Sequence, residues 1–321
     1  MRDYPDAPWM HTVQSTDVDE HAGAQPQWSL KYDQLSCGQF LGAVNQVQLP
    51  GLRLVYEASN CGVRQRGQIG EGCYGFAMTV DQPGEAIFNG QRLDRGSIMM
   101  GRSEDLDLSS PPMFSMIAIT VDGELLGSLW ERMYQKKLST WLDHQIVVQA
   151  RSGEADTLRA SHGGVLARLS ALPGLLKDPV AVLQIRDEIL IEWIEAIPMR
   201  VDISGLKNIE SRKRVVQRAC DMVLSQPDQA VSMLQLCNKI GASPRKLEYC
   251  FNDILGISPA KYLRTVRLNG VRRDIKRKQR PVIAVCELAA RWGFWHLGEF
   301  SALYKRQFGE LPSETLRQAR T

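Results

Sequence analysis

The sequence predicts a two-domain α+β protein, with an antiparallel β-barrel or sandwich and flanking helices first and an all-α domain second. Residues 36–122 consist of short apolar or alternating runs separated by turn residues, which is typical of antiparallel strands. The last third holds longer segments with helical periodicity, which form a loose internal repeat. Residues 207–321 contain 22 Lys and Arg against 10 Asp and Glu, whereas the rest contain 17 against 26. The two domains therefore favour different partners.

The composition is that of an ordinary globular protein. The 321 residues suffice for two domains, and 44% of them are apolar and 23% charged. Seven cysteines without a Cys-x-x-Cys pair favour buried thiols in a reducing compartment over a disulfide framework. No stretch approaches the roughly 18 apolar residues of a membrane helix, and the polar, acidic start lacks a signal-peptide core. We therefore expect a cytoplasmic chain without a membrane partner.

The amino-terminal half is predicted in three parts. Residues 1–30 lack sustained periodicity and contain several prolines, so we expect a loose arm. Residues 31–200 form the first domain, and Asn89-Gly90 is a strong hairpin signal within it. Segments long enough for the helical crossovers of a parallel sheet are missing from residues 36–122.

Two helical segments follow within residues 154–197, separated by Pro173-Gly174. Their apolar residues recur at spacings of three or four, which predicts helices that pack on the sheet. A second interpretation, which does not exclude the first, is that part of this surface pairs with a second subunit. The pattern ends at Pro198, and the change in charge that follows predicts an interdomain linker at residues 201–210.

Residues 211–321 are predicted to hold two helix-turn-helix units joined by a long helix. Serine and proline stand where several of these helices begin, as expected for an N-cap and a first helical position. The expected helices cover residues 211–224, 233–240, 244–255, 259–278, 282–292, 296–308 and 313–320.

The helix over residues 244–255 has the character of a DNA-recognition helix. Leu247, Cys250, Phe251 and Ile254 form an apolar stripe when it is wound at about 100° per residue. The side chains expected to contact DNA are Ser243, Arg245, Lys246, Glu248, Tyr249 and Asn252. In a major groove, Arg can pair with guanine, Asn with adenine and Glu with cytosine. The alternative is an ordinary solvated face, which the repeat and the basic charge of the domain make less favoured.

The second unit is poorer in groups that read bases. The winding of residues 296–308 buries Leu297, Phe300, Leu303, Tyr304 and Phe308. The residues expected to face DNA are His296, Gly298, Glu299, Ala302, Lys305 and Arg306. We therefore expect the first unit to discriminate sequence and the second to add affinity through phosphates or a thymine methyl group.

The connecting helix, at about 20 residues, is roughly 30 Å long, close to the roughly 34 Å between successive major-groove faces of B-DNA. One chain can then place both units on one side of a duplex. The connector cations Arg272, Arg273 and Lys276 are expected to contact phosphates.

At these residues the chain resembles the AraC/XylS family of bacterial transcription factors, over about residues 211–318. The motifs that carry the resemblance are Leu236-Cys237-x-x-x-Gly241-x-Ser243, Gly256-Ile257-Ser258-Pro259-x-x-Tyr262-Leu263-Arg264, and Leu288-Ala289 to Gly293-Phe294 with Phe300. The sequence around Gly293 to Gly298 is also similar to that of the ethanolamine-operon regulator branch of this family. The family commonly carries Ser and Arg where this chain has Gly298 and Ala302, and Ala where it has Cys237.

The resemblance implies double-stranded promoter DNA and RNA polymerase as partners, a homodimer, and a cupin-like amino-terminal barrel that senses an effector. We expect an activator. The alternative is a ligand-independent regulator or a repressor that uses its first domain only for dimerisation or protein contacts. Arg64 and Arg66 are basic residues with two interpretations, contact with an anionic effector or, more commonly for such residues, a place on the surface, so no effector site is assigned.

Two other classes of protein compete with this interpretation. A catalytic cupin needs a metal site built from barrel histidines, and residues 36–122 contain none, so we expect no enzyme, no metal and no cofactor. A non-specific architectural DNA-binding protein needs basic surface but little base-reading chemistry, whereas Arg245, Tyr249 and Asn252 share one helix face.

Overall fold

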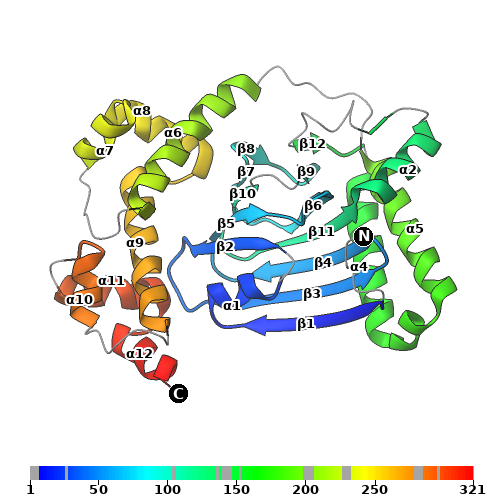
Figure 1. The fold of residues 1–321 in the computed structure, drawn as a ribbon, viewed down its shortest axis with the longest axis horizontal. Coiled ribbons are helices and arrows are strands. Elements are labelled where there is room, and N and C mark those ends of the chain that lie inside the picture. Colours follow the sequence, from blue (N-terminus) through cyan, green and yellow to red (C-terminus); the bar gives the residue numbers. More distant parts are fainter. Residues whose placement is uncertain are drawn as a thin grey trace.

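A computed structural model describes residues 7–25, 28–102, 106–134, 137–138, 147–151, 153–197, 206–225, 233–277, 285–294 and 297–320. It consists of antiparallel sheets followed by helices, which confirms the predicted order of the two parts (Figure 1). The helices α6 to α12 lie at the opposite end of the sheets from α2, α4 and α5 (Figure 1). Each helix of the described ranges is too short or too polar to cross a lipid bilayer.

The strands form two sheets, and every strand pair is antiparallel. The larger sheet has the order β1 (Trp9–Ser15), β3 (Gly42–Leu49), β4 (Leu52–Ser59), β11 (Phe114–Asp122), β6 (Cys73–Asp81), β9 (Ser97–Gly101) and β12 (Val147–Gln149). The smaller sheet has the order β2 (Ser29–Gln34), β5 (Val63–Gln68), β10 (Leu106–Ser109), β7 (Ala86–Phe88) and β8 (Gln91–Leu93).

The predicted closed, cupin-like barrel is not formed by the described strands. The edge strands of the larger sheet are β1 and β12, and those of the smaller sheet are β2 and β8, so neither sheet closes on itself or on the other. The predicted hairpin is present, because Asn89 (φ 48°) and Gly90 (φ 81°) connect β7 to β8 with the two positive φ angles of a type I′ turn.

The predicted loose arm is wrong for residues 9–23. Strand β1 pairs with β3 along its whole length, and helix α1 (Val18–Gly23) follows it. Asp17 caps α1 by accepting hydrogen bonds from the backbone N–H of Asp19 (3.0 Å) and Glu20 (3.3 Å). The arm showed no periodicity because β1 is a partly exposed edge strand and α1 has only six residues.

Helices α2 (Gly123–Tyr134), α4 (Glu154–Ala171) and α5 (Pro179–Ala196) belong to the first domain. The predicted break between the last two is confirmed by a 3₁₀ turn at Pro173–Lys177. Leu169 of α4 and Trp193 of α5 are buried in one core with Leu54, Phe76 and Ile117 of the larger sheet. These helices therefore cover one face of that sheet, as their apolar spacing predicted.

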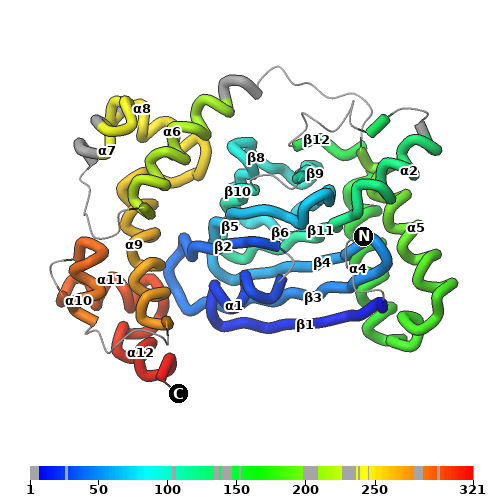
Figure 2. Tube along the Cα trace, viewed as in Figure 1, coloured from blue at the N-terminus to red at the C-terminus, as the bar shows by residue number. Residues whose placement is uncertain are grey.

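The C-terminal helices are α6 (Leu206–Ser225), α7 (Met233–Ile240), α8 (Pro244–Leu255), α9 (Pro259–Lys276), α10 (Val285–Arg291), α11 (Leu297–Phe308) and α12 (Pro312–Arg320). They agree closely with the predicted ranges, except that α6 begins five residues early. Residues 206–210 of the predicted linker are thus helical, and residues 201–205 lie outside the described ranges. Helix α9 runs from the group α6 to α8 to the group α10 to α12 (Figure 2).

Candidate nucleic-acid interface

The first unit consists of α6, α7 and α8, which share a hydrophobic core with the beginning of α9. Ser243 caps α8 by accepting a hydrogen bond from the backbone N–H of Lys246 at 3.2 Å, and Pro244 occupies the first helical turn. Helix α8 ends at Gly256, whose φ of 68° is the left-handed conformation that favours glycine at a helix C-terminus. These local signals fix both ends of the helix.

Helix α8 buries the face that its sequence predicted. Leu247, Cys250, Phe251 and Ile254 are all at most 2% exposed. On the opposite face, the predicted contact residues Ser243, Lys246, Glu248, Tyr249 and Asn252 are exposed. Arg245 belongs to α8, but its side chain lies outside the described part of the structure. The exposed face therefore offers several long hydrogen-bonding side chains to a ligand.

Arg212 of α6 orders part of this face, and sequence reasoning did not assign it to the site. Its guanidinium lies 5.8 Å from the centre of the Tyr249 ring and donates a hydrogen bond to the Tyr249 hydroxyl at 3.3 Å. It also forms an ion pair with Asp253 at 2.9 Å. A cation over an aromatic face is attractive, so Arg212 restricts the position of an aromatic ring that is 56% exposed. Only the general basic character of α6 pointed to such a role.

The second unit repeats the arrangement with α10, α11 and α12. Phe300, Tyr304 and Phe308 of α11 are buried, as predicted. Leu297 is 47% exposed and so contradicts its predicted burial, because it occupies the first position of α11, ahead of the turn that packs on the core. The predicted contact residues Gly298, Glu299, Ala302, Lys305 and Arg306 are exposed, and His296 lies outside the described ranges.

Helix α9 connects the two units and has 18 residues, so it is about 27 Å long. Its first half joins the core of the first unit, and Leu268, Val271 and Ile275 join the core of the second. Gly270 is needed for close packing there, because a Cβ atom at this position would lie 2.4 Å from the Trp292 ring. The Trp292 indole N–H donates to Asp274 at 2.9 Å, which fixes α10 against the connector.

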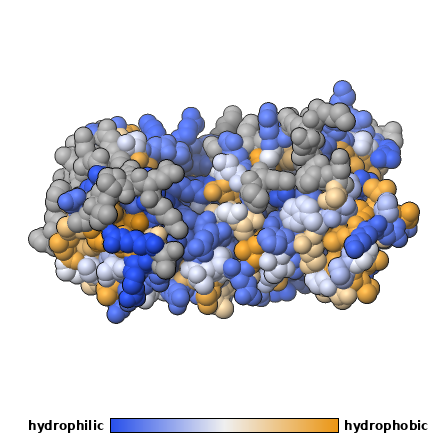
Figure 3. Space-filling model, turned by 60° about the horizontal axis from the view of Figure 1, so that its bottom comes forward, coloured by the Kyte–Doolittle hydropathy of each residue, from blue (hydrophilic) through white to orange (hydrophobic). Residues whose placement is uncertain are grey.

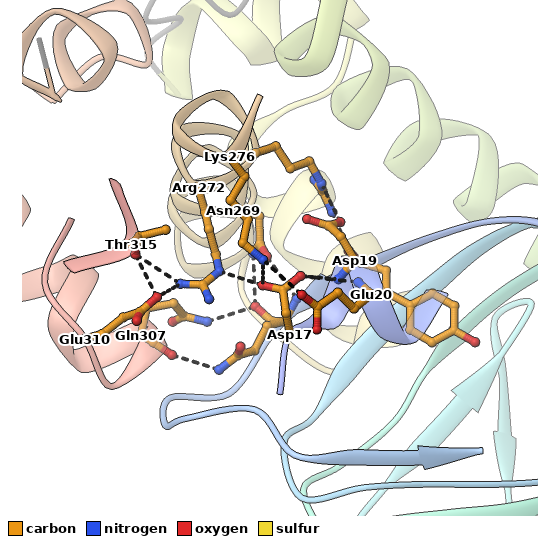
Figure 4. A network of polar contacts seen from close by, with 12 residues as sticks. Asp17, Asp19, Glu20, Asn269, Arg272, Lys276, Gln307, Glu310 and Thr315 are labelled. Atoms are coloured by element: carbon orange, nitrogen blue, oxygen red, sulfur yellow. Dashed lines mark hydrogen bonds and ion pairs between the residues drawn. The ribbon is translucent and has the colours of Figure 1, made fainter. Parts of the chain in front are cut away.

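The connector cations are placed differently from the prediction. Arg272 Nε lies 3.0 Å from Asp17 Oδ2 (Figure 4), and Lys276 Nζ lies 2.7 Å from the same oxygen. Arg273 pairs with Asp19 and Asp33, each at 2.9 Å. Asp17, Asp19 and Asp33 all belong to the first domain, and Arg272 also pairs with Glu310. The phosphate contacts of these three side chains stay a prediction, and in this arrangement of the domains the cations pair with carboxylates of the chain itself.

The contacts with basic side chains favour the charged form of two of these partners, Asp17 and Asp33. Burial raises the pKa of the Asp17 carboxyl, but the contacts with Lys276 and Arg272 outweigh it and lower that pKa below its usual value. Asp33 is fully buried, and Arg273 and Arg66 lower its pKa in the same way. The positive charge of this side of α9 is thus neutralised within the chain.

Comparisons with known proteins bear on this region. Residues 236–318 match the family model described as "Helix-turn-helix domain", and this range runs from α7 to α12. The match covers most of α7, all of α8 to α11 and most of α12, and it leaves α6 and the first domain outside.

Two curated relatives each match about a third of the chain. The probable thc operon regulatory protein of Rhodococcus erythropolis is 36% identical over 103 residues, which is 32% of this chain and 31% of that protein. The XylDLEGF operon transcriptional activator of Pseudomonas putida is 34% identical over 114 residues, or 36% of this chain and 34% of that protein. The matched region thus spans about a third of each relative's length.

A solved structure, that of the AraC-like transcriptional activator CuxR, aligns with 81% of this chain and 94% of its own at 14% identity. The TM-score of 0.42 is too low to establish a shared arrangement of domains.

Proposed function

We propose that this protein is a sequence-specific DNA-binding transcriptional regulator of the AraC/XylS type. The observation that carries the proposal is the exposed polar face of α8, within a region that matches a helix-turn-helix domain and relatives named as operon regulators. A solvated face needs no particular residues, whereas this face combines an amide, a carboxylate and an aromatic hydroxyl held by Arg212.

The two units make different kinds of contact with DNA. In the first, Asn252 presents an amide that can pair with adenine, and Glu248 can accept from cytosine; their side chains lie 3.5 Å apart. In the second, Lys305 and Arg306 approach phosphates, and Ala302 offers only a methyl group to a thymine. The first unit then selects the sequence, and the second adds affinity that depends on salt.

Asn252→Ala tests base reading against a phosphate-type control, Lys305→Gln. We expect Asn252→Ala to reduce the ratio of specific to non-specific affinity about 5- to 150-fold, because one bidentate base contact contributes roughly 1–3 kcal/mol. Lys305→Gln should weaken binding to all duplexes equally and reduce the salt slope by about one. Titrations at several salt concentrations, with a duplex selected by the wild-type protein and a scrambled one, measure both. Equal weakening on both duplexes by Asn252→Ala would contradict base reading.

We also propose that the protein works as a homodimer and an activator that contacts RNA polymerase. Support for a dimer comes from α5 and the turn before it, where Leu172, Val180, Leu183 and Ile191 are exposed. Hydrophobic surface gathers at the end of the molecule that carries α4 and α5 (Figure 3). Exposed apolar patches of this kind favour a protein partner. The alternative to activation is repression. We also propose that the protein acts in the cytoplasm.

A small-molecule effector is the remaining part of the proposal. Side chains of both sheets line an apolar pocket of about 60 Å³, and they include Phe88, Met99, Met116 and Ile119. Gln65 is a polar side chain in this lining, and its amide donates to the buried Glu57 at 3.0 Å. This lining suits a small, mostly apolar molecule with one hydrogen-bonding group. The alternative is a ligand-independent regulator, in which no effector binds in this pocket.

A further inference from the structure

The first domain contacts the C-terminal end of each recognition helix. At the end of α8, the Ser109 hydroxyl donates to the Leu255 carbonyl at 3.2 Å. At the end of α11, the Gln307 side chain donates to the Gln34 carbonyl at 2.8 Å, and Gln34 returns a hydrogen bond to the Gln307 carbonyl at 2.8 Å. The Gly38 amide donates to the same carbonyl at 3.1 Å. Both units are therefore fastened at the same end of their recognition helices.

The glycines that cap these helices occupy equivalent positions of the repeat, and both lie against the first domain. Gly256 has φ 68° and Gly309 has φ 78°. A Cβ atom at Gly256 would lie 3.5 Å from Ile87 of β7, and one at Gly309 would lie 3.1 to 3.3 Å from the Gln39 backbone. The first domain thus approaches each unit through a different segment, β7 in one case and the turn after β2 in the other.

Charged contacts strengthen both attachments. For the second unit, Arg272 pairs with Asp17 of the first domain and, at 2.6 Å, with Glu310 (Figure 4). Its guanidinium also lies 4.7 Å from the centre of the Phe308 ring of α11. Arg273 donates to Asp19, Asp33 and the Tyr32 carbonyl of the first domain.

For the first unit, the Arg64 side chain passes from β5 to the C-terminal domain. It is 0% exposed, pairs with Asp107, and donates to the Tyr262 hydroxyl of α9 and to Cys220 Sγ of α6. A buried guanidinium needs every one of these partners, because an unpaired charge in the interior is costly. This attachment is therefore as specific as that of the second unit.

The two units have separate hydrophobic cores, one including Tyr262 and Val266 of α9 and the other beginning at Leu268. Within the described residues, α9 contributes side chains to both cores. Because the first domain contacts both units, it forms a second connection between them.

We infer that the first domain is a brace that sets the relative orientation of the two helix-turn-helix units by docking on the C-terminal end of each recognition helix. The DNA-facing side chains named above stay exposed in the docked state, so the brace acts on spacing and does not cover the interface. A change in the first domain would then select among operators whose two half-elements differ in spacing. The inference about DNA rests on the proposed function, whereas the docking does not.

Arg273→Gln and Asp19→Asn weaken one docking contact from its two sides, and Arg264→Gln is a matched control because Arg264 is an exposed cation of the same helix. The first measurement needs no DNA and follows hydrogen exchange at Gly38, whose amide donates to Gln307. We expect exchange to quicken about 10-fold or more in both variants, since hydrogen bonds to charged groups are among the stronger ones. The control should exchange as the wild type does.

The second measurement compares affinity for a selected duplex with affinity for one that carries one additional base pair between its half-elements. One base pair turns the second half-element by about 34–36°, so we expect the wild type and the control to lose about 10-fold and the docking variants less than about 3-fold. Each ratio is taken within one variant, which cancels any lost phosphate contact.

Unchanged exchange in both docking variants would overturn the docking, and faster exchange with an unchanged spacing ratio would overturn the brace. If the wild-type protein selects no DNA sequence, the proposed function fails, and the exchange experiment still decides the docking.

Discussion

The buried ion pair between Arg64 and Asp107 gives the most direct test of how the two domains meet. The Arg64 side chain is 0% exposed and that of Asp107 is 8% exposed. The pair is bidentate, with Nε to Oδ1 at 2.8 Å and the second nitrogen to Oδ2 at 2.7 Å. Burial alone would raise the pKa of Asp107, but Arg64 lowers it below its usual value. Arg64 is thus the main group that favours the charged carboxylate, with smaller contributions from Arg66 and Lys213.

Arg64→Met removes this guanidinium while keeping much of its apolar volume. It leaves Asp107 buried without its bidentate partner, and it removes the hydrogen bonds to Tyr262 and Cys220. Breaking a buried pair from one side costs about 3–5 kcal/mol in the free energy of unfolding. The double variant Arg64→Met/Asp107→Asn buries no unpaired charge, so we expect it to recover at least about 1 kcal/mol of that loss.

Urea unfolding, followed by circular dichroism and tryptophan fluorescence, measures these free energies, and coincidence of the two curves checks the two-state treatment. Arg92→Met is the control, because the side chain of Arg92 is 64% exposed, and it should change stability by less than about 0.5 kcal/mol. A loss below about 1 kcal/mol for Arg64→Met would show that Arg64 is not buried between the domains in solution, and the docking would fail with it.

Three further predictions concern other parts of the molecule. Burial lowers the pKa of His162 to about 3, so as the pH falls the unfolded state binds a proton at this residue before the folded state does, and stability falls below about pH 6.5. Between pH 7.5 and 5, urea unfolding should show a loss of about 2 kcal/mol in the free energy of unfolding, and His162→Gln should lack this loss. Leu183→Glu, at a side chain 44% exposed on α5, should convert a dimer to a monomer in sedimentation, and an unchanged mass would exclude this surface. Gly298→Ser should keep the fold, because a Cβ atom there meets no atom within 4 Å, and should bind DNA at least as tightly as the wild type in titrations.

The C-terminal helices were predictable from sequence because their signals are local. Ser243 and Ser258 stand at N-caps, Pro244 and Pro259 at first helical positions, and Gly256 at a C-cap. Each of these preferences acts within one turn of helix, so a single sequence suffices to recognise it. The buried face of α8 followed from the same short range.

The contacts between the domains depend on residues far apart in sequence. Asp17 and Arg272 are 255 positions apart, and the sequence placed Asp17 in a loose arm and Arg272 on DNA phosphates. Arg64 was weighed only as a surface residue or as a ligand for an anionic effector, and it is a buried side chain that joins the domains. Periodicity also failed for β1 and α1, because a partly exposed edge strand and a six-residue helix leave too few repeats to detect.

The opposite charges of the two domains form ion pairs with each other within the chain. The sequence suggested different partners for each, but three cations of α9 pair with acidic residues of the first domain. Had Arg272, Arg273 and Lys276 all contacted phosphates, the slope of log affinity against log salt would be steeper by about 2.7, since each contact contributes about 0.9. A slope that steepens by about 0.9 when Asp19→Asn and Asp33→Asn are combined would show that these acidic side chains compete with DNA for Arg273. The net charge of a domain therefore overstates the charge that it can offer to a nucleic acid.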